Sequence, residues 1–568
     1  MAIPHAQTAR SHGLRHTARF LAACAAASLL FSPSPASARP DPDTPDWWTH
    51  ATFYEIFVRS FADAAHGPLA RDGKGDLQGL IDHLDYLNDG NPASEKSLGV
   101  TALWLMPVQP SPSYHGYDVT NYRAVNPDYG DVALMRRLVR EAHRRGMRVI
   151  VDFVLNHASS EHPLFRQALA SPGSPARAMF RFAKAPEQVA GPWGETVWHP
   201  GGGAFYYGVF SPAMPDWNFR DPAVTEHHRR AARFWLVDVG VDGLRLDAVR
   251  YFYEDGNQLQ DTPETRAWLR AFTDYCHRIR PGSFIVGECY ADSPTIASYQ
   301  NAGACDSLFE FDLAHATLEA VAKGDPGILS SALAETRGLD HDSARWSIFL
   351  ANHDQERTLT QLGGDRAKAR LAAELEFSLP GVPFVYYGEE IGMRGAKPDP
   401  DLRTPMQWTA AVPNAGFTAP DVRPWHPVNA DFAHVNVARE ESSPDSLLSL
   451  YKRLIRMNAA SPALRHGRPL PLSGGAPGVY AEFREVGGDA VLVVANLTAK
   501  PVACPAFSLA SSGLCTGVRA AEVLQGAAVS APALAPGGGF SDWRPLPSLA
   551  AESAYVVRFT GPAAGSAP

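Results

Sequence analysis

Eight short apolar segments between residues 52 and 390 constrain the fold of this chain more than any other feature. Each is a continuous apolar run, as expected for parallel strands buried on both faces. The segments are TFYEIFVR (52–59), ALWLMPV (102–108), RVIVDFV (148–154), GLRLDAV (243–249), SFIVGE (283–288), SLFEFD (307–312), SIFLANHD (347–354) and PFVYYGEE (383–390). Helical patterns lie between them, as in residues 131–145, where Asp131 can cap the helix and Gly146 can end it. Strands alternating with helices in this number predict an α/β fold of the (β/α)₈ barrel type.

One stretch inside the barrel pattern is too long for a simple connection. Residues 156–218 are rich in Pro, Gly and aromatic residues and lack clear periodicity. Because structureless loops of this length are rare in compact domains, we predict an inserted subdomain after the third strand. The barrel is then built from residues 47–155 and 219–465.

The pattern changes again near the C-terminal end. Two apolar runs, 479–484 and 490–496, flank Gly487-Gly488-Asp489, and 553–560 resembles a closing strand. Paired runs around a Gly-Gly-Asp turn are typical of a β-hairpin. We therefore predict a separate antiparallel β-sandwich domain over residues 466–565.

Residues 1–38 do not fit the barrel pattern. Three arginines precede the apolar run FLAACAAASLLF at 20–31, and an Ala-Ser-Ala site ends at Ala38. A positive segment, a short apolar segment and small residues in this order predict a secretory signal peptide, cleaved after Ala38, and export to the periplasm or the medium. Twelve apolar residues are fewer than the roughly 20 that a membrane-spanning helix needs.

Charge and cysteine content narrow the possible partners. The net charge of −9, from 51 Lys and Arg against 60 Asp and Glu, argues against nucleic acid or an anionic membrane surface as partner. Of the six cysteines, Cys24 leaves with the signal peptide, so an odd number remains. Cys504 and Cys515 are the best candidates for a disulfide, and without any CxxC pair a cysteine-based zinc site is not expected. Nothing in the sequence sets the oligomeric state.

Polar residues gather where four of the predicted strands end. Catalytic groups of such barrels lie at the C-terminal ends of the strands. The residues at these positions are Asp152, Asn156, His157, Arg245, Asp247, Glu288, His353 and Asp354. Any one of them could be a helix cap, a surface carboxylate or a core histidine, but their joint placement favours a site. The set suits an acid, a nucleophile and a stabilising group acting on a glycosidic bond, with Arg245 holding one carboxylate ionised.

The segments around these residues resemble the four sequence regions of the α-amylase family of glycoside hydrolases. The four matching segments, in the family's order, are DFVLNH (152–157), GLRLDAVR (243–250), VGEC (286–289) and FLANHD (349–354). HGYDVTNY (115–122), MPDWN (214–218) and RTPMQW (403–408) extend the resemblance over nearly all of the mature chain. MPDWN is similar to the MPDLN form of members intermediate between oligo-1,6-glucosidases and neopullulanases.

The resemblance implies the catalytic roles. Asp247 would be the nucleophile that forms a covalent glycosyl-enzyme. Glu288 would protonate the leaving oxygen and then activate water. Asp354 would bind the 2- and 3-hydroxyls of the sugar in subsite −1. Retention needs the carboxyl groups of Asp247 and Glu288 about 5–5.5 Å apart, which adjacent strand ends can supply.

The resemblance also implies a set of substrate-binding residues. Arg245 would keep the nucleophile ionised, and His157 and His353 would bind the same sugar by hydrogen bonds. Tyr117 would offer its aromatic face to that sugar. Asp118 together with Arg403 would reach the far hydroxyls.

An aspartate-rich loop follows the first predicted strand. Asp63, Asp72 and Asp76 lie in DAAHGPLARDGKGD, which resembles the calcium loop of family members. Carboxylate oxygens suit Ca²⁺, but an insertion between Asp63 and Asp72 disturbs the usual spacing, and a solvated turn is the alternative. No organic cofactor is expected.

The predicted function is an exported retaining hydrolase that cleaves α-1,4-glucosidic bonds of starch and maltooligosaccharides. Ala248 follows the nucleophile where members acting on α-1,6 bonds tend to have valine. An α-glucosidase or a transglycosylase acting on short α-glucosides is the alternative, and endo or exo attack stays open. A non-catalytic barrel that binds glycans or a partner chain is disfavoured because all three catalytic carboxylates are present.

Overall fold

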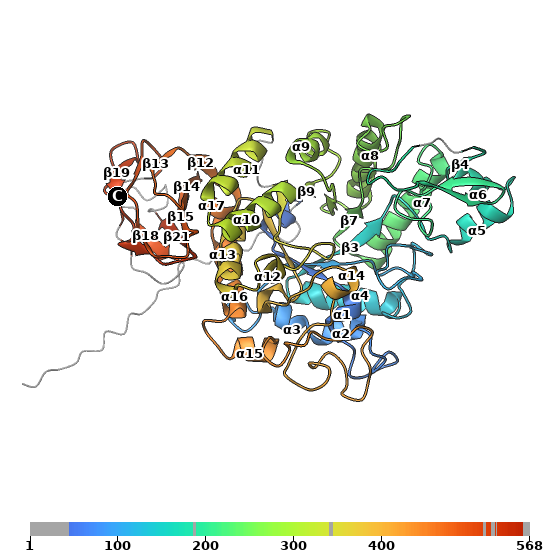
Figure 1. Cartoon of the computed structure of the whole chain (residues 1–568), viewed down its shortest axis with the longest axis horizontal. Helices are drawn as coiled ribbons and strands as arrows, with labels where there is room; N and C mark the ends of the chain where they lie inside the picture. The colour runs from blue at the N-terminus through green and yellow to red at the C-terminus, as the bar shows by residue number, and fades with distance from the viewer. Residues whose placement is uncertain are drawn as a thin grey trace, which may run out of the picture. The chain divides into compact units, whose positions relative to one another are not determined.

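Eight parallel strands close into a barrel in the computed structural model, which describes residues 45–185, 189–339, 345–514, 519–523, 529 and 531–560. Around the barrel the strands follow the order β1-β11-β10-β9-β8-β7-β3-β2 (Figure 1). Their bounds are β1 (Phe53–Ile56), β2 (Ala102–Leu105), β3 (Arg148–Val154), β7 (Gly243–Asp247), β8 (Phe284–Gly287), β9 (Ser307–Phe309), β10 (Trp346–Ile348) and β11 (Val382–Tyr386). Each strand overlaps one of the eight predicted segments, so the predicted barrel is confirmed.

Helices connect the strands and cover the outside of the barrel. They are α1 (Val58–Phe61), α2 (Leu77–Asp82), α3 (Leu84–Leu87), α4 (Val132–Arg144), α7 (Pro222–Arg233), α8 (Pro263–Ile279), α9 (Ser293–Asn301), α10 (Phe311–Lys323), α11 (Pro326–Leu339), α12 (Thr358–Gln361), α13 (Arg366–Glu376), α14 (Asp399–Leu402), α15 (Val437–Glu441), α16 (Leu447–Ala460) and α17 (Pro462–His466). The described residues also include two 3₁₀ helices, η1 (Trp47–His50) and η4 (Glu389–Ile391), and one π-helix, η2 (Phe234–Val239). As predicted, Asp131 caps α4, where its side chain accepts a hydrogen bond from the Leu134 amide. Leu138 and Ala142 are buried on the face that α4 turns to the barrel.

A small three-stranded sheet lies between β3 and β7 in the sequence, where we predicted an insertion. It has the antiparallel order β4-β6-β5, with β4 (Phe182–Ala183), β5 (Trp198–Gly201) and β6 (Ala204–Tyr207), and it follows α5 (Pro163–Ala170) and α6 (Pro175–Ala178). Trp217 is buried and stacks on Phe180, with 4.5 Å between ring centroids. The insertion is therefore a folded unit and not an open loop.

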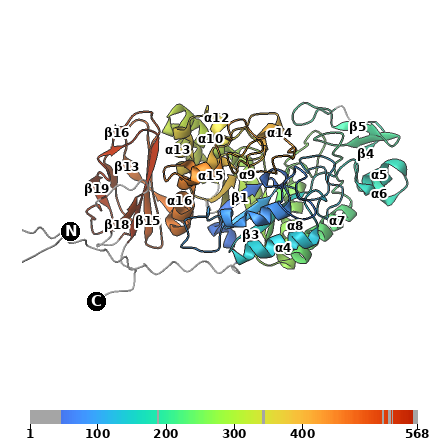
Figure 2. The same ribbon diagram turned by 90° about the horizontal axis from the view of Figure 1, so that it is seen from below.

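The C-terminal part is made of antiparallel sheets, as predicted (Figures 1 and 2). One sheet has the order β12-β14-β15-β21-β18, a second β13-β17-β19, and β16 pairs with β20. The strands are β12 (Arg468–Leu470), β13 (Leu472–Gly474), β14 (Val479–Val486), β15 (Asp489–Asn496), β16 (Val502–Ala503), β17 (Phe507–Leu509), β18 (Arg519–Val523), β19 (Phe540–Trp543), β20 (Ser548–Leu549) and β21 (Ser553–Thr560). The predicted hairpin turns at Gly487 and Gly488, whose φ angles of 54° and 87° favour glycine.

Strand β15 is apolar on both faces because each face packs against a different core. Leu492 and Val494 belong to the core of the C-terminal sheets, whereas Val491 and Val493 belong to the core shared with the barrel. Polar contacts join the same two parts: the Arg337 guanidinium donates to both oxygens of Glu482, at 2.5 and 3.0 Å. The C-terminal sheets thus pack directly on the barrel.

Two predictions fall on residues that the structure does not describe. The signal peptide, residues 1–38, lies outside the described residues, and so does Cys515, the predicted partner of Cys504. Among the described residues, no helix combines the length and the apolar character needed to cross a membrane. The domain boundaries that we set from the sequence stay predictions.

Candidate active site

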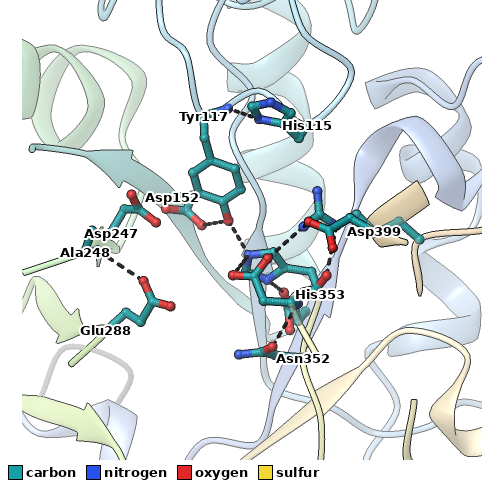
Figure 3. A network of polar contacts seen from close by, with 12 residues as sticks. His115, Tyr117, Asp152, Asp247, Ala248, Glu288, Asn352, His353 and Asp399 are labelled. Atoms are coloured by element: carbon teal, nitrogen blue, oxygen red, sulfur yellow. Dashed lines mark hydrogen bonds and ion pairs between the residues drawn. The ribbon is translucent and has the colours of Figure 1, made fainter. Parts of the chain in front are cut away.

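Two carboxylates stand side by side at the ends of β7 and β8. Asp247 is the last residue of β7, and Glu288 follows β8 directly. The backbone hydrogen bonds between β7 and β8 continue to Glu288, whose amide donates to the Leu246 carbonyl at 2.9 Å. Figure 3 shows both side chains on the same side of Tyr117. Adjacent parallel strands therefore bring the predicted nucleophile and the predicted acid together.

A single buried guanidinium holds three carboxylates. The Nη1 atom of Arg245 lies 2.9 Å from Asp152 Oδ1 and 2.7 Å from Asp247 Oδ1. Its Nη2 atom lies 3.0 Å from Glu288 Oε2. The Arg245 side chain is fully buried beside the Trp104 ring, 5.1 Å from its centroid. Because solvent does not screen these contacts, the cation couples the charges of all three acids.

The three acids around Arg245 bind protons more tightly than ordinary carboxyls. Burial raises the pKa of Glu288 despite Arg245, and the charge on Asp247 raises it further. Burial likewise raises the pKa of Asp152 to about 7. Burial also raises the pKa of Asp247, so the ion pair with Arg245 reduces this shift without reversing it. A protonated Glu288 at moderate pH is what a general acid requires.

Asp354 has the opposite electrostatic surroundings. Its oxygens lie 3.3 Å from His353 Nε2 and 2.7 Å from Arg403 Nη2. Burial would raise the pKa of Asp354, but His353 and Arg403 outweigh it and hold the pKa below its usual range. The Asp354 side chain is 47% exposed. An ionised carboxylate open to solvent can accept hydrogen bonds from sugar hydroxyls.

His353 is held as a cation by carboxylates on both sides of its ring. Its Nδ1 atom lies 2.6 Å from Glu55 Oε1 on β1, and its Nε2 atom faces Asp354. Burial opposes the charge, yet Asp354 and Glu55 raise the pKa of His353 to about 10. His353 is therefore an imidazolium cation at neutral pH.

Tyr117 forms the aromatic wall of the site. Its hydroxyl donates to Asp152 Oδ2 at 3.0 Å, and it lies 2.6 Å from His353 Nε2 (Figure 3). The Tyr117 and His353 rings stack at 12°, with centroids 5.4 Å apart. His157 contacts the Tyr117 carbonyl at 3.2 Å, and burial lowers the pKa of His157 to about 4. His157 is thus a neutral hydrogen-bonding group, unlike His353.

Asp118 and Arg403, which we predicted to reach the far hydroxyls of the sugar, have different partners in the structure. Asp118 accepts hydrogen bonds from the hydroxyls of Ser111 and Ser113, which precede it in the same loop. Arg403 donates to the His353 carbonyl at 2.9 Å and to Asp354. Arg403 therefore lies among the site residues, whereas the carboxylate of Asp118 is used within its own loop.

Sequence reasoning missed two acids of this network and gave a third no role. Glu55 and Asp399 were not predicted, although Glu55 contacts His353 and Asp399 lies 3.3 Å from Arg403. Asp152 was noted as a strand-end residue only. A carboxylate inside an otherwise apolar strand was the available signal for Glu55, since a buried charge needs a partner. Nothing local distinguishes Asp399 from a surface residue.

Ala248 adopts an unusual backbone conformation directly after Asp247. Its φ angle is 48°, in the left-handed region that non-glycine residues rarely occupy. In this conformation the Ala248 amide donates to Glu288 Oε2 at 3.1 Å. Backbone strain of this kind is often found at active sites, where other contacts hold it in place.

The predicted calcium loop is held together by hydrogen bonds. Both oxygens of Asp63 and both of Asp76 accept from backbone amides, at 2.8–3.1 Å, and Asp76 caps α2. Asp72 accepts from the Lys74 amide, and the Lys74 ammonium lies 2.7 Å from Asp128. Within the described parts of the chain, no group of three acidic, histidine or cysteine side chains could hold a metal ion. Calcium binding here stays a prediction that these contacts do not favour.

Comparisons with known proteins find one matching family and several relatives. The family description "Alpha amylase, catalytic domain" matches residues 55–467. The chain is 37% identical to "Alpha-amylase 3" of Dictyoglomus thermophilum over 79% of this chain and 85% of that protein. It is 34% identical to a "Trehalose synthase/amylase" of Mycobacterium tuberculosis, covering 81% and 83%. The solved α-amylase of H. orenii superimposes with a TM-score of 0.77 at 35% identity, over 90% of this chain and 99% of that chain.

Proposed function

Since the chain belongs to the α-amylase family of glycoside hydrolases, we propose that it hydrolyses α-1,4-glucosidic bonds of starch and maltooligosaccharides with retention of configuration. The observation that carries this proposal is the contact of one guanidinium, that of Arg245, with both Asp247 and Glu288. Both carboxyl groups lie within ion-pair distance of the same guanidinium, and a retaining mechanism needs two carboxyl groups close together, which supports the proposal.

The reaction begins with attack of Asp247 on the anomeric carbon. As the bond from the carboxylate oxygen to this carbon forms, the glycosidic bond breaks and its oxygen takes the proton of Glu288. The leaving sugar departs and the donor sugar stays bound to Asp247 as an ester. Glu288, now a carboxylate, takes a proton from water, the water oxygen attacks the anomeric carbon, and Asp247 leaves as the carboxylate.

Arg245 keeps the charge balanced through both steps. In the first step negative charge disappears from Asp247 and appears on Glu288, and both groups are ion-paired to the same guanidinium. The cation therefore does not need to move while the charge does, which is a form of preorganised electrostatic stabilisation. Asp354 and His353 bind the hydroxyls of the donor sugar, and Tyr117 covers one of its faces.

Two further observations bear on the linkage and on the balance between hydrolysis and transfer. Ala248 favours α-1,4 bonds, by resemblance to family members. The relative named "Trehalose synthase/amylase" supports a second candidate, an α-glucosidase or transglycosylase acting on short α-glucosides. Chromatography of products from maltose and maltotetraose separates the two: the second candidate is correct if glucose or longer oligomers dominate from maltose.

Reducing-sugar release from starch and maltotetraose tests the proposal directly. We expect the wild type to release reducing sugar whose first-formed anomer is α, measured by proton NMR. Asp247→Ala and Glu288→Gln should each reduce the rate by about 10³-fold or more, because both groups act on the reacting bond. Asp421→Ala is the control, since this exposed carboxylate pairs only with Arg71 at 2.6 Å among its described contacts. Full activity of Asp247→Ala would refute the mechanism.

We also propose that residues 1–38 direct export. The support is the arrangement of arginines, apolar run and Ala-Ser-Ala site in the sequence. Expression in a bacterial host followed by N-terminal sequencing tests this, with Arg39 expected as the first residue of the exported protein. Export with residues 1–38 still attached would contradict cleavage after Ala38.

A further inference from the structure

A tryptophan stands exposed on a tight turn of the inserted subdomain. The side chain of Trp193 is 58% exposed, although large apolar side chains are usually buried. The turn is ordered by its own hydrogen bonds: the Gly191 amide donates to the Glu195 carbonyl at 2.8 Å, and the Trp193 amide donates to Glu195 Oε2 at 2.9 Å. The indole is thus held outward by a fixed backbone.

Trp193 belongs to a cluster of three aromatic rings. Its centroid lies 5.6 Å from that of Phe210 and 5.8 Å from that of Tyr251, and these two rings are 5.4 Å apart. Phe210 is also in contact with the His157 ring at 5.2 Å. Tyr251 and Phe210 supply the more buried base of the cluster, and Trp193 supplies its open surface.

This aromatic cluster adjoins the catalytic acid. Tyr251 and Ala248 share one small apolar core, and the Ala248 amide donates to Glu288. Figure 3 shows Ala248 and Glu288 across the site from Asp399, which pairs with Arg403 beside Asp354.

The side on which the cluster lies identifies what it can bind. Glu288 protonates the oxygen of the leaving sugar, so the leaving sugar lies on its side of the broken bond. Asp354 and Arg403 hold the donor sugar on the other side. Aromatic faces pack well against the apolar face of a sugar ring, because both surfaces are flat and lose water on contact.

We propose that Trp193, with Phe210 and Tyr251 beneath it, is a stacking platform for a glucose unit on the leaving-group side of the cleaved bond. The inference rests on the proposed function and deepens it. The platform makes the enzyme prefer chains that extend past the cleavage point. It also holds an acceptor sugar near the glycosyl-enzyme, so it raises the share of transfer over hydrolysis.

The test compares two substrates that differ only on the leaving-group side. Maltotetraose places sugars over the platform, whereas α-glucosyl fluoride has a single-atom leaving group that cannot reach it. For Trp193→Ala we expect kcat/KM on maltotetraose to fall about tenfold, as for loss of one aromatic stacking contact, and kcat/KM on the fluoride to stay within about twofold of wild type. Trp193→Phe keeps a ring in place and is expected to retain most of the activity on maltotetraose.

Each outcome decides for or against the platform. An equal loss on both substrates, or no loss on either, overturns it, and a thermal melt of Trp193→Ala verifies that the variant is folded. If the wild type hydrolyses the fluoride but not maltotetraose, the proposed substrate is refuted, and the platform is judged by glucosyl transfer from the fluoride to added maltose. A smaller fraction of glucosyl groups transferred to maltose by Trp193→Ala than by the wild type then supports the platform, and an equal fraction overturns it. If the wild type turns over neither substrate, both proposals are refuted.

Discussion

Glu55 offers the sharpest test of the electrostatic account of the site. It touches His353 from the side opposite to Asp354, and we assign it no contact with substrate. Both side chains are buried, and the contact between them is 2.6 Å long. Glu55→Gln keeps an oxygen that can accept the Nδ1–H hydrogen bond of His353 but removes one of the two negative charges that hold the imidazolium.

The expected magnitude follows from the contact. A carboxylate in direct contact with a buried ionisable group shifts its pKa by about 1–3 units, or about 1.4–4 kcal/mol. The pKa of His353, raised to about 10 mainly by Asp354 and Glu55 against burial, is therefore expected to fall to between about 7 and 9 in the variant. At about pH 5.5 His353 stays protonated in both proteins, but at pH 9 it is mostly protonated in the wild type and at most about half protonated in the variant.

The assay is the ratio of kcat/KM for the variant and the wild type, measured on maltotetraose from pH 5.5 to 9. The ratio removes the pH dependence of Glu288 that both proteins share. We expect it to lie within about threefold of one at pH 5.5 and to be lower at pH 9, by about twofold if the pKa of His353 falls to about 9 and by about 90-fold if it falls to about 7. Glu390→Gln is the matched control, because Glu390 is equally buried but accepts from Tyr54 and Tyr86. A ratio that does not change with pH for Glu55→Gln would refute the reasoning.

The remaining predictions concern stability. Burial lowers the pKa of His162 to about 3 and of His227 to about 4, and it lowers that of His228 as well, so the unfolded chain binds more protons. The contribution of these histidines to the free energy of unfolding is therefore highest above about pH 6.5. As the pH drops below about 6.5, it decreases by up to about 1.4 kcal/mol per pH unit for each histidine. Urea unfolding at pH 7 and at pH 5 measures this decrease. Glu482→Gln should lower the free energy of unfolding by about 1–3 kcal/mol, by weakening the partly buried pair with Arg337, and an unchanged urea midpoint would contradict it. Incubation with a chelator should leave the melting temperature unchanged, whereas a clear drop would establish a structural metal.

The barrel could be predicted from the sequence because its signal is local. A strand buried on both faces is a continuous apolar run, and β3 (Arg148–Val154) coincides with the run from which it was predicted. The ends of strands were predicted less well. Segment 347–354 was expected to be a strand throughout, but β10 ends at Ile348. Asn352 explains part of this, since its side chain accepts from the Asp354 amide and stabilises a turn there.

The contacts that set the charges of the site could not be predicted in this way. Glu55 and His353 are 298 positions apart in the sequence and meet only because β1 and β10 both join β11. A local sequence pattern can also fit two different structures, and Asp76 is an example. An aspartate before Leu-Gln-Gly-Leu suits a metal loop and a helix cap equally, and the structure uses it as the cap of α2.

Residue type alone does not assign the acid and the ionised groups of this site. Asp247 and Glu288 share the single cation Arg245 with a third carboxylate, and their pKa values rise. Asp354 lies between two cations, and its pKa falls. One rim therefore supplies both a carboxyl that can donate a proton and a carboxylate that stays charged. The forked guanidinium matters here, because its two nitrogens hold Asp247 and Glu288 at once, whereas the point charge of a lysine could pair closely with only one.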